Sequence, residues 1–120
     1  MKSEEIDHNF SRRVCDLVSR IPYGKVMTYG DIATLCGQAN AARIVGGIAH
    51  YGDPSLPWHR VVNRFGGLAS GFTGQVVDAW LGTEGAPGGR EGHRMVLESE
   101  DVPVNDDNII MDFLERRWLP

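Results

Sequence analysis

The chain has 120 residues, 42% of them hydrophobic, which is enough for one modest core and too little for two independent domains. Its net charge of −4 by itself argues against a nucleic-acid partner, because phosphate contacts require Lys and Arg. No apolar run approaches the roughly 20 residues that cross a bilayer, and the first residues lack an apolar signal region. We therefore expect one soluble, cytoplasmic domain over residues 1–120, which in a bacterium would lie at the nucleoid.

The first half of the chain predicts three helices. Apolar residues repeat at helical spacing over residues 10–21, and a proline then ends that helix. Thr28 and Asp31 have the spacing of a capping box, with Asp in place of the usual Glu, and predict a second helix that closes at a glycine. Asn40 is a good N-cap for a third helix reaching about His50. Two short helices joined by a tight glycine-containing turn are typical of a helix-turn-helix.

The third predicted helix has a face that core packing does not require. Gly46 and Gly47 stand in its interior, where each costs about 1 kcal/mol relative to alanine. One explanation is that a helix bare of side chains brings its backbone close to another surface, with Arg43 projecting beside it. The other is a glycine-mediated contact with a helix of the same domain, and this segment alone leaves both open.

The second half of the chain is less regular. A stiff corner at Pro57 leads into a short buried strand at residues 61–62. Nine of the 27 residues from 66 to 92 are glycine, which predicts a mobile loop in which residues 76–81 are able to form a short helix. The remaining predicted elements are a helix over residues 88–98 and a small hairpin over residues 102–113 that turns at 105–108.

Three motifs together point to a family. They are Pro57-Trp58-His59-Arg60-Val61-Val62, Pro22-Tyr23-Gly24-Lys25-Val26 with Thr28-Tyr29-Gly30-Asp31-Ile32-Ala33, and Ala42-Arg43-Ile44-Val45-Gly46-Gly47. The first resembles the Pro-Cys-His-Arg-Val signature of the O6-alkylguanine-DNA alkyltransferases, with tryptophan at the reactive cysteine, a replacement that defines the alkyltransferase-like proteins. The resemblance implies a mainly α, winged helix-turn-helix-like three-helix domain with a small C-terminal β-hairpin.

The resemblance also implies roles around the helix-turn-helix. Its second helix would enter the minor groove, which explains a face left bare at Gly46 and Gly47. Arg43 matches the arginine that replaces an extruded base, and a guanidinium can stack and donate several hydrogen bonds there. Tyr29 matches the tyrosine that helps to rotate the nucleotide and contacts the extruded guanine. A surface arginine and a core tyrosine are the purely structural alternatives.

Position 58 decides the question of enzyme activity. Alkyl transfer requires a thiolate, activated in the family by the neighbouring histidine, a water and a glutamate. Trp58 offers only a donor N–H, so transfer to this position is excluded, although its ring can wall a lesion pocket and pack against an alkyl group or a base. His59 remains beside it in that pocket. Cys15 and Cys36 match nothing in the transferase site and lack metal-ligand spacing, so we assign both to the core.

The other site residues follow from the same resemblance. Arg60 and Glu100 are assigned to the lesion pocket, and Glu100 is preferred to Glu84 as the match to the family's glutamate. Ser70 lies in the loop expected to close over the extruded base, where its hydroxyl would hydrogen-bond O6. Residues 72–92 have no clear family counterpart and are interpreted as an insertion, either disordered or used for a partner.

The sequence thus predicts a non-enzymatic sensor that flips O6-alkylguanine out of double-stranded DNA and directs nucleotide excision repair proteins to it. No metal, cofactor or membrane is expected, and the chain should act as a monomer. Residues 98–115, with seven acidic and no basic side chains, are interpreted as a solvated face or a partner surface. An alkyltransferase using another residue and a helix-turn-helix transcription regulator remain alternatives, although the second fits poorly with glycines where base-reading side chains should stand.

Overall fold

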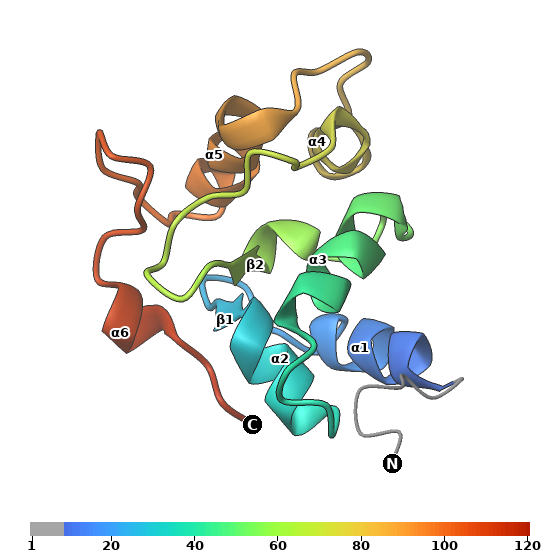
Figure 1. Ribbon diagram of the computed structural model, residues 1–120. Coiled ribbons are helices and arrows are strands. Elements are labelled where there is room, and N and C mark those ends of the chain that lie inside the picture. Colours follow the sequence, from blue (N-terminus) through green and yellow to red (C-terminus); the bar gives the residue numbers. More distant parts are fainter. Residues whose placement is uncertain (1–8) are drawn as a thin grey trace.

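The computed structural model describes residues 9–120, which form a mainly helical domain with a two-stranded parallel sheet (Figure 1). The elements are α1 Phe10–Val18, β1 Met27–Thr28, α2 Tyr29–Leu35, α3 Ala42–Tyr51, the 3-10 helix η1 Trp58–Arg60, β2 Val61–Val62, α4 Gly74–Leu81, α5 Gly89–Ser99 and α6 Phe113–Arg116. The predicted mainly α, helix-turn-helix architecture is confirmed. No helix of the described part is long and apolar enough to cross a membrane.

The helix-turn-helix begins at the predicted capping box. Thr28 Oγ1 accepts the Asp31 N–H at 2.9 Å, and the Asp31 carboxylate accepts the Thr28 N–H at 3.1 Å. Gly37, with φ at +88°, closes the turn after α2 in the left-handed region that glycine tolerates. The prediction of Asn40 as the next N-cap is wrong, because α3 begins at Ala42 and the buried Ala41 precedes it without any side-chain cap.

The main core lies where α1, α2 and α3 meet the sheet and the α4–α5 pair. The apolar face of α1 is buried as predicted, and Ile21 stays buried although the helix ends three residues earlier, at Val18. A smaller cluster beneath the C-terminal segment contains Val26, Val62, Leu68, Leu97, Val102, Val104 and Ile110. The two clusters hold the helix-turn-helix against the second half of the chain.

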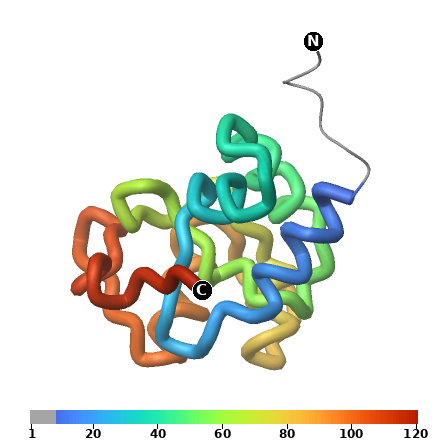
Figure 2. The backbone as a smooth tube through the Cα atoms, turned by 90° about the horizontal axis from the view of Figure 1, so that it is seen from below, coloured from blue at the N-terminus to red at the C-terminus, as the bar shows by residue number. Residues whose placement is uncertain are grey.

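The parallel sheet brings distant parts of the sequence together. Met27 pairs with Val61 and Thr28 with Val62, so the start of α2 lies next to η1. A further parallel bridge joins Val26 to Arg117, and Figure 2 shows the C-terminal segment running beside the stretch that enters β1. Residues at the beginning of α2 and in η1 can therefore line one site.

The glycine-rich stretch forms α4 and the start of α5 rather than the loop that its composition predicts. Val76 and Val77 are buried, and the two helices pack against each other. The Asp78 carboxylate accepts hydrogen bonds from the Thr83 hydroxyl and from two backbone N–H groups at residues 85–86, which fixes the connecting turn. The short helix predicted at residues 76–81 is confirmed.

The predicted C-terminal hairpin is reduced to one antiparallel bridge, between Val104 and Ile110. The Asn105 side chain accepts two backbone N–H groups and forms the turn at the predicted place. Asn108 and Asp112 both adopt positive φ, which interrupts the extended backbone and prevents a longer ladder. The chain then enters α6, which the sequence pattern did not predict.

Candidate nucleic-acid interface

A pocket of about 270 Å³ opens between α3, the indole of Trp58 and the loop over residues 69–73. Its walls contain four residues that the sequence assigned to the site, namely Tyr29, Gly46, Trp58 and Ser70. They come from the start of α2, the middle of α3, η1 and the following loop. The structure therefore brings together residues that are up to 41 positions apart (70 − 29).

Trp58 forms a fixed wall of this pocket. Its side chain is buried, and Nε1–H donates a hydrogen bond of 2.9 Å to the Asp53 carbonyl. Gly52 makes room for the ring, because a Cβ added there would lie 2.8 Å from it. The single polar group of the indole is thus already engaged, and the ring offers the pocket an apolar surface.

Tyr29 separates this pocket from a second one of about 550 Å³ that reaches Arg43. The tyrosine is the first residue of α2, so the capping box fixes its position. Burial raises the pKa of its hydroxyl, which therefore remains protonated and able to donate at neutral pH. Gly46 also lines both pockets, and together with Tyr29 forms their common wall.

The exposed face of α3 is open as a binding surface requires. A Cβ added to Gly46 or Gly47 would meet no atom of the described chain within 4 Å, so an internal helix–helix contact does not explain the two glycines. Arg43 is exposed, and its side chain makes no hydrogen bond or ion pair with any residue between 9 and 120. The helix therefore presents bare backbone beside an unpaired positive charge.

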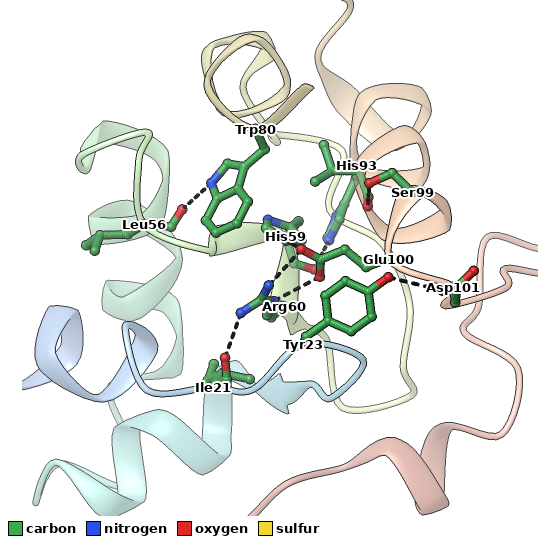
Figure 3. Close-up of polar contacts among 11 residues, drawn as sticks. Ile21, Tyr23, Leu56, His59, Arg60, Trp80, His93, Ser99, Glu100 and Asp101 are labelled. Carbon is green, nitrogen blue, oxygen red and sulfur yellow. Dashed lines mark hydrogen bonds and ion pairs between the residues drawn. The ribbon is translucent and has the colours of Figure 1, made fainter. Parts of the chain in front are cut away.

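His59, Arg60 and Glu100 do not line the pocket. They form a buried cluster with one another instead (Figure 3). Arg60 donates two hydrogen bonds to the Glu100 carboxylate, at 2.9 and 2.7 Å, and one to the Ile21 carbonyl at 2.8 Å. His59 Nε2 lies 3.0 Å from the same carboxylate. Successive side chains of a 3-10 helix point about 120° apart, which turns these two residues away from the pocket that Trp58 faces.

Electrostatics explain how the cluster tolerates burial. Burial opposes ionisation of Glu100, but the hydrogen bonds from His59 and Arg60 lower its pKa to about 2. Burial also lowers the pKa of His59, although Glu100 acts in the opposite direction. Glu84, the alternative match to the family's glutamate, is exposed in the turn after α4. The geometry therefore favours Glu100 as the carboxylate that orients His59.

A second histidine, which the sequence analysis did not identify, holds the pocket loop over residues 69–73 in place. The fully buried His93 accepts the Ala69 N–H at Nδ1 and donates from Nε2 to the His59 carbonyl, at 3.0 and 2.9 Å. Phe72 stacks on its ring with the centroids 4.4 Å apart. Burial lowers the pKa of His93 to about 4, so the neutral ring can accept and donate at once.

The same loop is fastened to α3 from above. His50 Nδ1–H donates a hydrogen bond of 2.8 Å to the Gly71 carbonyl, next to the exposed Ser70. In the sequence, His50 marks only the approximate end of the third predicted helix. Neither histidine has a local signal that predicts these contacts, because each partner lies more than 20 positions away.

The fold and this interface define a helix-turn-helix protein with a nucleic-acid-binding surface, and comparison with known proteins agrees. Residues 9–102 match the family model described as "6-O-methylguanine DNA methyltransferase, DNA binding domain". The chain belongs to this family.

Relatives and solved structures give a finer comparison. The chain is 48% identical over 67 residues to the "DNA base-flipping protein" of Escherichia coli and 45% identical over 62 residues to "Alkyltransferase-like protein 1" of Schizosaccharomyces pombe, matches that cover 54% and 50% of this chain. They span about half of those relatives, 52% and 57% of their lengths. The structure of S. pombe Atl1 with DNA containing O6-carboxymethylguanine matches with a TM-score of 0.71 and 30% identity, covering 97% of this chain and all of that one.

Proposed function

We propose that this chain is a non-enzymatic sensor of O6-alkylguanine, which binds duplex DNA and holds the extruded base without chemical change. The observation that carries the proposal is an indole wall in a pocket beside an open, arginine-bearing helix. Trp58 stands in the motif where the family's signature has its reactive cysteine. The printed name of the E. coli relative and the lesion in the S. pombe complex support base flipping and an alkylated guanine as the ligand.

The absence of a nucleophile supports the non-enzymatic assignment. The Trp58 N–H is engaged with the Asp53 carbonyl and has no lone pair able to attack an alkyl carbon. Cys15 and Cys36 lie outside the pocket lining, and burial raises the pKa of both thiols, which keeps them protonated at neutral pH. Neither cysteine is therefore a substitute for the family's reactive one.

The binding mode follows from the order of the groups along the interface. α3 lies in the minor groove with its glycine face against the DNA, and Arg43 fills the space that the extruded base leaves. Tyr29, which lies in the wall between the two pockets, contacts the nucleotide as it rotates out of the duplex. The base then lies against Trp58, and Ser70 donates a hydrogen bond to O6. The apolar ring surface of Trp58 suits an alkyl group.

We extend the proposal to the partners and location of the chain. It acts as a monomer in the cytoplasm, and the persistent complex directs nucleotide excision repair proteins to the lesion. Residues 72–92 are an insertion whose Trp80 packs on His59 and Arg60 and seals the buried cluster. The acidic side chains of residues 98–115, apart from the buried Glu100, form a solvated face.

The decisive experiment compares two duplexes that differ only in guanine or O6-methylguanine at one position. We expect tighter binding of the lesioned duplex, and an unchanged protein mass after incubation with it. Equal affinity for both duplexes would refute the sensor, and preference for one sequence regardless of the lesion would favour a transcription regulator. A protein mass increased by one CH2 unit would show that the chain is an alkyltransferase.

A further inference from the structure

The second pocket, of about 550 Å³, has no role in holding the extruded base. It is a groove between the first half of α3 and the turn that follows β2. Arg43 lines one wall, and Arg64 and Phe65 line the other. Phe65 is 62% exposed, so its ring lies open at the edge of this groove.

The groove concentrates positive charge that nothing in the described chain neutralises. Arg43 and Arg64 are both exposed, and neither donates a hydrogen bond or forms an ion pair within residues 9–120. Other arginines are engaged internally, such as Arg60 with Glu100 and Arg117 with Asp31. A chain of net charge −4 therefore keeps two free guanidinium groups around a single groove.

The turn presents its two side chains from a rigid frame. The Asn63 carboxamide oxygen accepts the N–H groups of Phe65 and Gly67, each at 2.8 Å. Gly66 adopts a φ of +81° and packs so closely on Phe113 that an added Cβ would lie 2.7 Å from its ring. The Arg64 guanidinium carbon lies 4.8 Å from the Phe65 ring centroid. Such a cation–π contact orients the guanidinium and leaves its charge and donors available.

The position of the groove relative to the lesion pocket indicates which part of the DNA it binds. The two pockets share Tyr29 and Gly46 as a wall, so a nucleotide whose base fills the first has its sugar at that wall. The adjoining phosphodiester must then lie over the second. In the proposed function Arg43 enters the duplex, which leaves Arg64 to meet this phosphate. We infer that Arg64, backed by Phe65, is a second DNA contact: it binds the backbone phosphate beside the nucleotide that faces the lesion pocket, whether or not that nucleotide carries an alkyl group.

This inference rests on the proposed function, and its test separates the two. Binding of guanine and O6-methylguanine duplexes is measured over a series of salt concentrations for the wild type, Arg64→Ala and Arg20→Ala. Arg20 is also an exposed arginine and lines a different pocket, so both variants lose the same charge. We expect Arg64→Ala to weaken binding of both duplexes roughly tenfold at low salt. The slope of log K against log salt should decrease by about 0.9, and the ratio between the duplexes should stay unchanged.

Phe65→Ala supplies an independent readout, since this exposed ring makes no contribution to the core clusters. This variant should lower the affinity for both duplexes less than Arg64→Ala does. The double variant should bind no more weakly than Arg64→Ala alone. If Arg64→Ala binds as Arg20→Ala does, or changes only lesion discrimination, the phosphate contact is refuted while the sensor stands. If the wild type does not distinguish the duplexes, the proposed function fails and this inference fails with it.

Discussion

The molecule uses arginine in two opposite ways on the two sides of η1. Behind η1, Arg60 is 9% exposed and donates to a carboxylate and a backbone carbonyl, with its guanidinium under the Trp80 ring. In front of it, Arg43 and Arg64 are exposed and have no hydrogen-bond or ion-pair partner in the part of the chain that the structure describes. The first region is closed and internally neutralised, and the second is open and positively charged.

This difference teaches where the chain keeps its binding capacity. A buried charge must be paired, because an unpaired one loses its hydration without compensation. An unpaired exposed arginine costs little and remains free for an external anion. The net charge of the chain therefore gives the wrong indication about DNA binding. It argues against a DNA partner, whereas the exposed arginines in front of η1 favour one. Substitutions behind η1 should change stability, and substitutions in front of it should change binding.

The largest effect should come from breaking the buried pair. Glu100→Ala leaves Arg60 buried without its carboxylate and should lower the free energy of unfolding by about 3–5 kcal/mol. Urea unfolding measures this loss. Glu98→Ala is the matched control, because that exposed glutamate pairs with Arg94 only at 3.4 Å and its loss should cost less than about 0.5 kcal/mol. Similar effects of the two variants would contradict the division between the regions.

A fall in pH should lower the free energy of unfolding, because His93 in the closed region behind η1 becomes protonated. Burial lowers the pKa of this histidine from its ordinary value of 6.5 to about 4, so the folded state binds the proton more weakly than the unfolded chain does. Its contribution is therefore complete above pH 6.5 and is lost as the pH falls toward 4, by about 3 kcal/mol in total. The depressed pKa of Glu100 adds a further loss between pH 4.5 and about 2.

Comparison with His93→Gln isolates this effect, since glutamine can accept from Ala69 and donate to the His59 carbonyl without titrating. The free energy of unfolding is measured between pH 7.5 and 4.5 for both proteins. The variant should show a shallower decline over pH 6.5–4.5, whatever its stability at neutral pH. Parallel curves would mean that another group causes the acid sensitivity.

A substitution in the open region in front of η1 should weaken DNA binding and leave the free energy of unfolding nearly unchanged. Arg43→Ala should leave the free energy of unfolding within about 0.5 kcal/mol of the wild type, because the side chain has no internal partner. Binding to the lesioned duplex should weaken by about 30-fold, since nothing then fills the stack when the base leaves. Fluorescence of a base analogue placed next to the lesion, which changes when the lesioned base leaves the stack, would report reduced extrusion. Unchanged affinity would refute the role assigned to this arginine.

The sequence predicts the residues on the pocket side of η1 better than those in the buried cluster on its other side. Local motifs place Tyr29 after a capping box, Gly46 within a helix and Trp58 after a stiff proline corner, and each of these depends on neighbours in the chain. The structure brings all three to one pocket. The family resemblance is what assigns them to one site; the parallel sheet that joins the motif of Tyr29 to the motif of Trp58 is seen only in the structure.

The back of η1 and the turn after β2 depend on distant partners, which the sequence pattern does not specify. The family resemblance predicts His59 and Arg60 in the pocket, but the 3-10 geometry of η1 turns them toward Glu100, 40 positions from Arg60. His93 had no recognisable motif at all. The polar turn at Arg64 and Phe65 gains meaning only when α3 is seen across the groove from it.

The smallest effect tests how the two regions are joined at the start of α2. Thr28→Ala removes the hydroxyl that caps the Asp31 N–H and should cost about 1 kcal/mol of unfolding free energy. Thr34→Ala, at an exposed position of the same helix, is the control and should change stability by less than about 0.5 kcal/mol. Because the cap positions Tyr29 at the wall between the pockets, Thr28→Ala should also weaken lesion binding more than binding to undamaged DNA. Equal weakening of both would mean that the cap serves folding alone and that Tyr29 finds its place without it.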